Sequence, residues 1–155
     1  MIRLVPKTGE RLEQWSAAMW GDYHHSLREA GFSEEEATAN VERNREALLV
    51  DGRLKADQHV FDAVEGDDVV GTLWLAPREG EGSQDAWYVY DIAIDPHFRG
   101  RGLGRATMQA AEEFVRSKGA ASLSLNVFGV NTVARNLYES LGFRPLAISM
   151  RKDLD

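Results

Sequence analysis

One stretch of the sequence constrains the fold more than any other: an apolar run followed by a glycine-rich turn and an amphipathic helix. The run AWYVYDIAI, residues 86–94, is rich in aromatic and β-branched residues and is largely apolar on both faces, which predicts a central strand. Gly100, Gly102 and Gly104 come next, and apolar residues then recur at helical spacing as far as Phe114. A buried strand that leads through glycines into a helix predicts an α/β domain.

The glycine-rich turn has the composition of an anion site. The segment from Arg99 to Arg105 holds three arginines and three glycines, and no Asp or Glu lies between Pro96 and Ala111, although the chain has a net charge of −7. Glycine lets backbone approach a ligand closely, and the first amides of a helix have no intrahelical partner. With the arginines added, we expect this segment to bind phosphate groups.

Two common nucleotide-binding motifs fit this segment poorly. A dinucleotide fingerprint requires a third Gly or Ala where Arg105 stands, and an acidic residue about 20 positions further on. The nearest acids, Glu112 and Glu113, lie inside the expected helix. The Walker pattern GxxxxGK[ST] does not occur. A nicotinamide-dependent enzyme and a P-loop NTPase are therefore weak alternatives.

The rest of the chain predicts the element order β α α β β β α β α β. Ser33 and Glu36 form a capping box that begins a second helix, and alternating Leu146, Ile148 and Met150 predict a last strand. This order predicts one domain over residues 1–155, with a mixed, mostly antiparallel sheet and about four helices. The other expected elements are a strand over 2–5, a helix ending near 31, strands within 59–77 joined by a tight turn at 66–67, a helix closing near 118–119, a strand over 121–127 and a helix from 131 to 142.

Composition narrows the function further. The chain has no cysteine, which excludes a disulfide framework, a thiolate metal site and thiol nucleophile chemistry. The pI near 5.1 disfavours a nucleic-acid binder, and no window approaches the roughly 20 apolar residues of a membrane span. His24 and His25 diverge by about 100° on a helix and are a poor metal pair. We expect a cytoplasmic protein without a metal.

Two motifs carry a resemblance to a known family. RGRGLG, residues 99–104, resembles the Arg/Gln-x-x-Gly-x-Gly/Ala signature of the GCN5-related N-acetyltransferase (GNAT) superfamily, and NTVARNLYESLGF, residues 131–143, resembles its Asn-x-x-Ala-x-x-x-Tyr-x-x-x-Gly-Phe segment. The motifs lie in family order, and the resemblance covers roughly residues 88–151. It implies a sheet with splayed central strands, acetyl-CoA as cosubstrate and direct transfer of an acetyl group to a primary amine in a ternary complex.

The resemblance also implies where acetyl-CoA binds. Backbone of the splayed strand would hold the pantetheine arm, and the glycine-arginine segment would hold the pyrophosphate. Arg101 and Arg105 are not assigned individually by the motif, and we expect them near the 3′-phosphate or the adenine. Asn131 would contact the cofactor at the start of its helix, and it reads equally as an N-cap. The residues so implied are Ile92, Ala93, Ile94, Arg99, Gly100, Arg101, Gly102, Leu103, Gly104 and Asn131.

Tyr138 and Asp91 are the candidate catalytic residues. In similar enzymes the tyrosine at the position of Tyr138 protonates the leaving thiolate, and a phenol is protonated at neutral pH as a general acid must be. Taken without the resemblance, Tyr138 reads as a core residue. Asp91 stands in an apolar run, where burial would raise its pKa, and it reads either as the general base or as the partner of an arginine or an amide. Tyr90 would lie on the opposite face of the strand unless a bulge intervenes.

The sequence leaves four questions open. A non-catalytic acyl-CoA binding or sensor module would carry the same motifs. The acceptor is a small-molecule amine or a peptide or protein amine, and a homodimer is plausible because relatives often dimerise. The first two helices of the family usually shape the acceptor site, although Trp15, Met19 and Tyr23 also read as a core stripe. The candidate acceptor-site residues are Trp15, Trp20, Tyr23, His24, His25 and Trp74.

Overall fold

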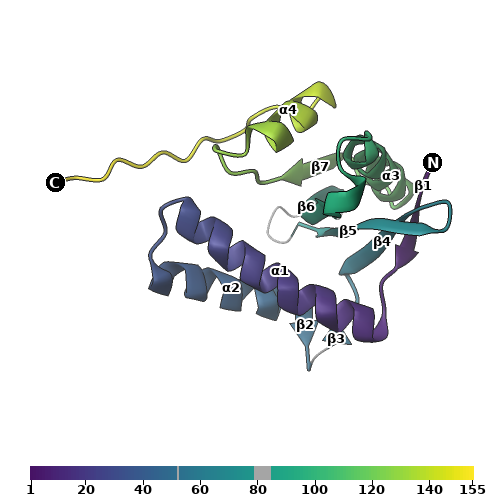
Figure 1. The fold of residues 1–155 in the computed structure, drawn as a ribbon, viewed down its shortest axis with the longest axis horizontal. Helices are drawn as coiled ribbons and strands as arrows, with labels where there is room; N and C mark the ends of the chain where they lie inside the picture. The colour runs from purple at the N-terminus through teal and green to yellow at the C-terminus, as the bar shows by residue number, and fades with distance from the viewer. Residues whose placement is uncertain (52, 79–84) are drawn as a thin grey trace.

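The computed structural model describes residues 1–51, 53–78 and 85–155, and its centre is a mixed five-stranded sheet (Figure 1). The strand order is β1-β4-β5-β6-β7. The first four strands pair antiparallel, and β7 pairs parallel with β6, so the predicted mixed, mostly antiparallel sheet is confirmed. The strands are β1 (Ile2–Pro6), β4 (His59–Glu65), β5 (Asp68–Pro77), β6 (Ala86–Ile94) and β7 (Ser122–Leu125).

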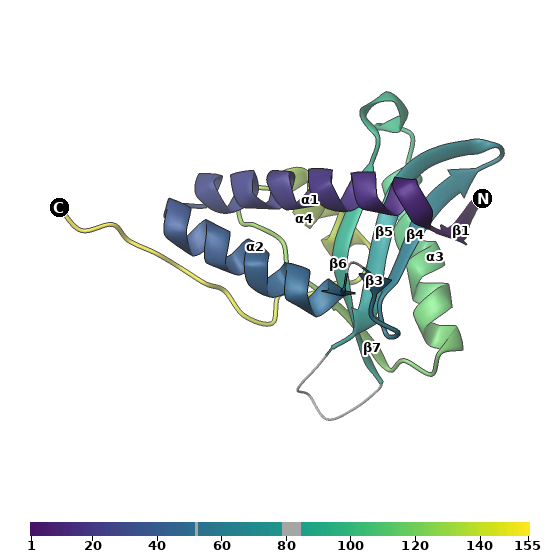
Figure 2. The ribbon, with the colours of Figure 1, turned by 90° about the horizontal axis from the view of Figure 1, so that it is seen from below.

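Helices cover both faces of this sheet, as Figures 1 and 2 show. Helices α1 and α2 lie side by side on one face, α3 lies on the other, and α4 lies beside β7. Their bounds are α1 (Gly9–Glu29), α2 (Glu34–Leu48), α3 (Leu103–Ser117) and α4 (Thr132–Ser140). A 3-10 turn η1 (Pro96–Phe98) precedes α3, and a small hairpin of β2 (Leu49–Val50) and β3 (Arg53–Leu54) follows α2.

Strand β5 contributes side chains to two hydrophobic cores, one on each face of the sheet. Leu73 and Leu75 face α3 and pack with Met108 of that helix, whereas Trp74 between them faces the opposite layer and packs with Trp20 of α1. Successive side chains of a strand point to opposite faces of a sheet. The nearly continuous apolar character of β5 and β6 is therefore the mark of a sheet that is covered on both sides.

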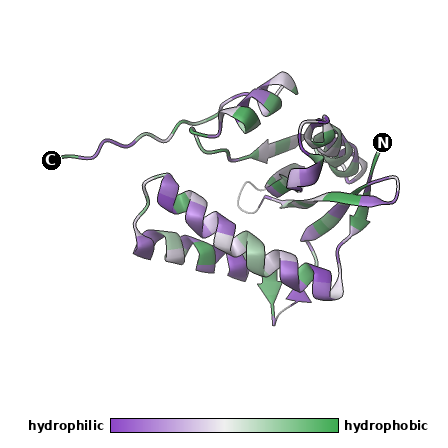
Figure 3. Cartoon of the chain, viewed as in Figure 1, coloured by the Kyte–Doolittle hydropathy of each residue, from purple (hydrophilic) through white to green (hydrophobic). Residues whose placement is uncertain are grey.

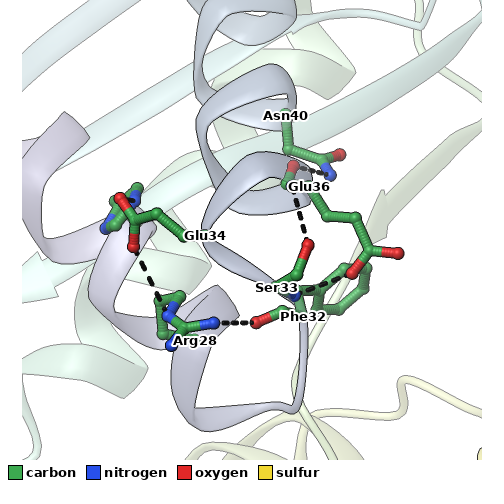
Figure 4. Close-up of polar contacts among 7 residues, drawn as sticks. Arg28, Phe32, Ser33, Glu34, Glu36 and Asn40 are labelled. Carbon is green, nitrogen blue, oxygen red and sulfur yellow. Dashed lines mark hydrogen bonds and ion pairs between the residues drawn. The ribbon is translucent and has the colours of Figure 1, made fainter.

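A capping box fixes the turn between α1 and α2 (Figure 4). The Ser33 hydroxyl accepts a hydrogen bond from the Glu36 amide at 3.1 Å, and the Ser33 amide donates to the Glu36 carboxylate at 2.7 Å. Arg28 donates to the carbonyl of Phe32 at 2.9 Å and pairs with Glu34 at 3.5 Å. These contacts confirm the predicted capping box and satisfy the first amides of α2.

Two predictions of secondary structure were wrong. Leu49–Val50 and Arg53–Leu54 pair as the short strands β2 and β3, where the predicted element order contains no strand. The last strand, predicted from alternating Leu146, Ile148 and Met150, does not form, and residues 143–155 are extended without regular hydrogen bonding. A strand requires a neighbouring strand, and no described strand of this chain lies beside that segment. The predicted polar loop at 78–85 lies largely outside the described residues.

Candidate active site

Strands β6 and β7, at the centre of the site, are paired along only part of β6. Residues Ala86–Val89 of β6 pair with β7, and the strand then continues for five further residues, 90–94, beyond the end of β7. We call the open side of residues 90–94 the fork. Ala93 is exposed there, and Ile92 and Ile94 are partly buried. Their backbone groups on this side do not pair with β7, and those other than the Ile94 carbonyl, which accepts from Arg99, can bind a ligand laid along the strand.

A β-bulge at the start of the fork decides which way two side chains point. Trp74 pairs with Asp91 and Leu75 pairs with Val89, so Tyr90 is the extra residue. Tyr90 stacks on Trp74 with ring centroids 4.8 Å apart, and the Trp15 side chain donates a hydrogen bond to Asp91. Because Trp15 and Trp74 both belong to the layer beneath α1, the bulge places Tyr90 and Asp91 on the same face of the sheet.

The environment of Asp91 raises the pKa of its carboxyl group above the ordinary value. Burial is the largest effect and raises the pKa of the Asp91 carboxyl to about 6. The nearby Asp22 carboxylate raises this pKa further, whereas hydrogen bonds from the Trp15 side chain and the Ile92 amide lower it. A carboxyl group with this pKa is largely ionised at neutral pH and can still take a proton from a substrate.

Tyr138 lies within electrostatic range of Asp91. It lies on α4, its ring is 5.9 Å from that of Phe143, and it packs against the core on the α3 side of the sheet. Burial raises the pKa of the Tyr138 phenol, and the charge of Asp91 raises it further. The phenol is therefore protonated at neutral pH. The Asp91 carboxyl and the Tyr138 phenol come from distant parts of the chain and are close enough to interact electrostatically.

The glycine-arginine segment adopts a conformation that side chains disfavour. Gly100 and Gly102 have φ angles of 77° and 76°, in the left-handed region, and Gly102 caps the N-terminus of α3. No described atom lies within 4 Å of where a Cβ would stand on either glycine. Bare backbone, open space and the amides at the start of α3 fit a pyrophosphate group.

The arginines of this segment are held by the protein itself. Arg99 donates through Nε to the carbonyl of Ile94 at 2.8 Å, which ties the segment to the end of β6. The Arg101 guanidinium lies 5.6 Å from the centre of the Phe98 ring. Arg105 Nη2 donates to Ser140 Oγ at 2.6 Å and so links α3 to α4. These contacts position the positive charges around the start of α3.

Asn131 forms the N-cap of α4. Its side-chain oxygen accepts from the Ala134 amide at 3.2 Å, as the sequence predicted. Gly104 brings α4 close to α3, because a Cβ on Gly104 would stand 3.3 Å from Leu137 Cδ2. The helix that carries Tyr138 is therefore positioned by a cap at one end and by close packing along its length.

A cavity of about 300 Å³ opens between α1, α2, β5 and β6. Trp20, Tyr23 and Trp74, three of the candidate acceptor-site residues, line it and also pack in the core beneath α1, whereas Trp15 does not line it. His24 and His25 instead pair with Glu34 and Glu29 at 3.0 and 3.3 Å. Lining residues that the sequence analysis did not identify are Asn44, Arg78, Tyr88, Val89, Asn126 and Phe128.

The position of Asn126 and Phe128 after a predicted strand could have identified them as candidate ligand-binding residues. Both residues directly follow β7, and ligands of open α/β sheets bind beyond the carboxyl ends of parallel strands.

Among the described residues, no group of three or more His, Cys, Asp or Glu side chains could hold a metal ion. The described helices include none that is long and apolar enough to span a membrane.

The forked sheet and the glycine-arginine turn into α3 define an acetyltransferase fold of the GNAT class. Residues 12–143 match the model of the acetyltransferase (GNAT) family, and the chain therefore belongs to this family. The crystal structure of the putative acetyltransferase YycN from Bacillus subtilis superimposes with a TM-score of 0.89 and 28% identity over 99% of both chains.

Sequence relatives agree with this assignment. YdgE, an uncharacterized N-acetyltransferase of Bacillus subtilis, is 32% identical over 125 residues, which are 79% of this chain and 78% of that protein. The match to YycN is 37% identical over 56% of this chain, and the matched segment spans about half (55%) of YycN. The mycothiol acetyltransferase of Beutenbergia cavernae is 34% identical over 64% of this chain and 35% of its own length.

Proposed function

We propose that residues 1–155 act as one acetyl-CoA-dependent N-acetyltransferase domain that acetylates a primary amine by direct transfer in a ternary complex. The observation that carries this proposal is the open side of β6 beyond β7, which begins beside the buried Asp91 carboxyl, whose charge raises the pKa of the Tyr138 phenol. A base and an acid on either side of an open strand edge are what an acyl transfer to an amine requires.

The fork and the glycine-arginine segment are our candidate sites for acetyl-CoA, which supplies the acetyl group as a reactive thioester. The backbone of Ile92, Ala93 and Ile94 would hold the pantetheine arm along the open side of β6. Amides between Gly100 and Gly104 would bind the pyrophosphate, with positive charge from Arg99 and Arg101. Asn131 would contact the cofactor from the start of α4.

The residues of the chain then move two protons. Asp91, directly or through a water, takes the proton of the acceptor ammonium and leaves a neutral amine able to attack. The amide of Ala93 or Ile94 stabilises the developing oxyanion. Tyr138 donates its phenolic proton to the departing sulfur. After the attack the nitrogen loses its second proton to the Tyr138 phenolate, and Asp91 releases its proton to solvent. The ammonium and the thioester thus give an amide, a thiol and one proton.

The aromatic cavity beneath α1 is our candidate site for the acceptor. Tyr90 lines this cavity and directly precedes Asp91, so an amine held there would lie next to the base. Aromatic faces attract cations, and the rings of Tyr23, Trp74 and Tyr88 line this cavity. We propose a small-molecule amine or a peptide or protein amine as acceptor. One relative, from Beutenbergia cavernae, is named a mycothiol acetyltransferase.

Thiol release from acetyl-CoA tests the proposal, read with a chromogenic disulfide across a panel of amines. The chain has no cysteine and so contributes no background. We expect release that depends on one class of amine, together with coenzyme A binding by calorimetry. An Arg99→Glu, Arg101→Glu variant should bind coenzyme A at least tenfold more weakly. Binding without release for any amine would instead support a non-catalytic acyl-CoA module, and no binding would refute the cofactor site.

A further inference from the structure

The cavity between α1, α2, β5 and β6 carries one charge among the described residues that line it, and that charge is positive. Arg78, the residue directly after β5, supplies it. None of the described lining residues is acidic. A polyamine or an aminoglycoside has several ammonium groups, and those beyond the reacting one would enter this cavity without a carboxylate partner. The lining therefore disfavours a polycation as acceptor.

The sheet places Arg78 beside Tyr88. The Arg78 amide donates to the carbonyl of Ala86 at 2.9 Å, and Tyr88 lies two residues further along β6, on the same face of the sheet. The central carbon of the guanidinium lies 5.1 Å from the centre of the Tyr88 ring, a contact that holds the positive charge at the cavity wall. A guanidinium has five N–H donors, so contacts within the protein and a contact to a ligand carboxylate are compatible.

Two phenols add hydrogen-bond donors near this guanidinium. Tyr23 of α1 and Tyr88 both line the cavity, and Arg78 and Tyr23 both act electrostatically on the Tyr88 phenol. Burial raises the pKa of both phenols, so each keeps its proton at neutral pH. The Tyr23 hydroxyl accepts from Asn44 Nδ2 at 3.5 Å, and its own proton can be donated elsewhere. We call Tyr23, Arg78 and Tyr88 the distal cluster.

The distal cluster is displaced from Asp91 along the sheet. Tyr88 precedes Asp91 by three residues of β6, and their partners on β5, Ala76 and Trp74, are two residues apart. At the rise of a strand, these counts correspond to about 7–10 Å. An α-amino acid is too short to reach both places, because its amine and carboxylate share one carbon atom. A dipeptide in extended form spans about 7 Å.

Much of the cavity lining suits an uncharged segment. Met19, Trp20 and Trp74 line it. The indole N–H groups of the two tryptophans donate within the protein, to Ser16 at 3.0 Å and Gln58 at 2.7 Å, so these rings offer a ligand apolar surface. Figure 3 shows α1 as a helix of mixed hydrophilic and hydrophobic residues, and apolar residues of this helix pack toward the sheet. The part of a ligand between two charged ends would therefore contact apolar groups.

We propose that the acceptor is an extended amino carboxylate, which places its primary amine at Asp91 and its carboxylate at the distal cluster. Amino acids with the amine at the far end of the chain and short peptides share this chemistry. The inference rests on the proposed function, because the base at Asp91 fixes the amine end. It narrows the acceptor from any primary amine to one with a carboxylate several bonds away.

Three acceptors with six carbon atoms each test the charge of the far end: ε-aminocaproate, ε-aminocaproamide and hexamethylenediamine. They share the reacting amine and end in a negative, a neutral and a positive group. We expect kcat/KM from thiol release to be at least about tenfold higher for the acid than for the amide, and lowest for the diamine. Leucylglycine and leucylglycinamide repeat the comparison for peptides. Equal values for acid and amide in both pairs would overturn the proposal, and a preference in one pair identifies the kind of acceptor.

Arg78→Gln tests whether the distal cluster is the source of this preference. The variant removes the positive charge, so the preference for acid over amide should fall to about twofold or less. Tyr88→Phe keeps the ring beside Arg78 and removes one donor, so it should weaken the preference less. Arg116→Gln is the matched control, because Arg116 lies on α3 at the other face of the sheet, and it should change nothing. With folding checked by circular dichroism, a preference that survives Arg78→Gln would refute the proposal.

Binding measurements distinguish failure of this inference from failure of the proposed function. With coenzyme A in place of acetyl-CoA, calorimetry detects the acceptor without transfer. We expect ε-aminocaproate to bind, and Arg78→Gln to weaken that binding by about tenfold while the amide is unaffected. Such selective binding without thiol release for any amine would support the distal cluster and refute the proposed function. Release at equal rates from acids and amides would do the reverse, and an acid that neither binds nor reacts would overturn the inference.

Discussion

At the scale of single residues, Tyr138 is the most direct test of the acid role. A Tyr138→Phe change keeps the ring packed beside Phe143 and removes only the hydroxyl. Since proton transfer by a positioned side chain contributes 10²–10⁴-fold, we expect kcat to fall by about 10²-fold or more. The affinity for coenzyme A, measured by calorimetry, should stay within about twofold. An unchanged kcat would exclude Tyr138 as the acid.

The ionised, buried Asp91 is predicted to lower the free energy of unfolding while it serves as the base in catalysis. Its pKa rises from 3.8 to about 6 on folding, so the native state binds more protons than the unfolded state between these values. The contribution of this group therefore lowers the free energy of unfolding as the pH rises from about 4 to 6. Asp91→Asn should be more stable than wild type at pH 7 in urea denaturation, yet turn over more slowly. The stability difference should shrink at pH 4, and a difference independent of pH would contradict the assignment.

At the scale of elements, Gly71 sets how closely β5 approaches the fork. A Cβ at this position would stand 2.2 Å from the carbonyl oxygen of Ala93, which is backbone and cannot rotate away. Gly71→Ala should lower the free energy of unfolding by about 1–3 kcal/mol. Gly21→Ala is the matched control, because nothing lies within 4 Å of its Cβ position in α1. That change should raise stability by about 1 kcal/mol through helix propensity.

A buried ion pair joins β4 to the segment before α1. Lys7 and Asp62 are each 6% exposed and contact one another, and Arg11 adds a second bond to Asp62 at 3.1 Å. Asp62→Asn leaves the Lys7 charge buried without its partner, so urea denaturation should show a loss of about 3–5 kcal/mol. A Lys7→Met, Asp62→Leu double variant should regain most of that loss. A neutral Asp62→Asn change would show that the pair contributes little.

Local signals in the sequence predicted most elements correctly. The capping box at Ser33 and the turn at Gly66 carry their geometry in a few neighbouring residues, and both lie where expected. The tail carried an equally clear strand pattern at Leu146 and Ile148, and that prediction was wrong. Alternation shows that a segment suits a sheet but does not supply the neighbouring strand.

At the scale of the whole molecule, the candidate site depends on contacts that the sequence could not place. The sequence identifies Asp91 and Tyr138 separately as candidates, and only the fold places them within electrostatic range of one another. The bulge at Tyr90 was a stated alternative, and no residue type marked it in advance. Asp22 and Trp15 on α1 modulate Asp91 from about 70 positions away, beyond the reach of any local pattern.

The pH dependence of kcat/KM for the amine tests the central claim most directly, because it measures the base within the assembled site. Wild type should show an ascending limb near pH 6, set by Asp91. Asp22→Asn removes a like charge and should move this limb to lower pH. Trp15→Phe removes a hydrogen bond to the carboxylate and should move it to higher pH. Opposite shifts in the two variants would support Asp91 as the base, whereas a limb that both leave in place would contradict the account.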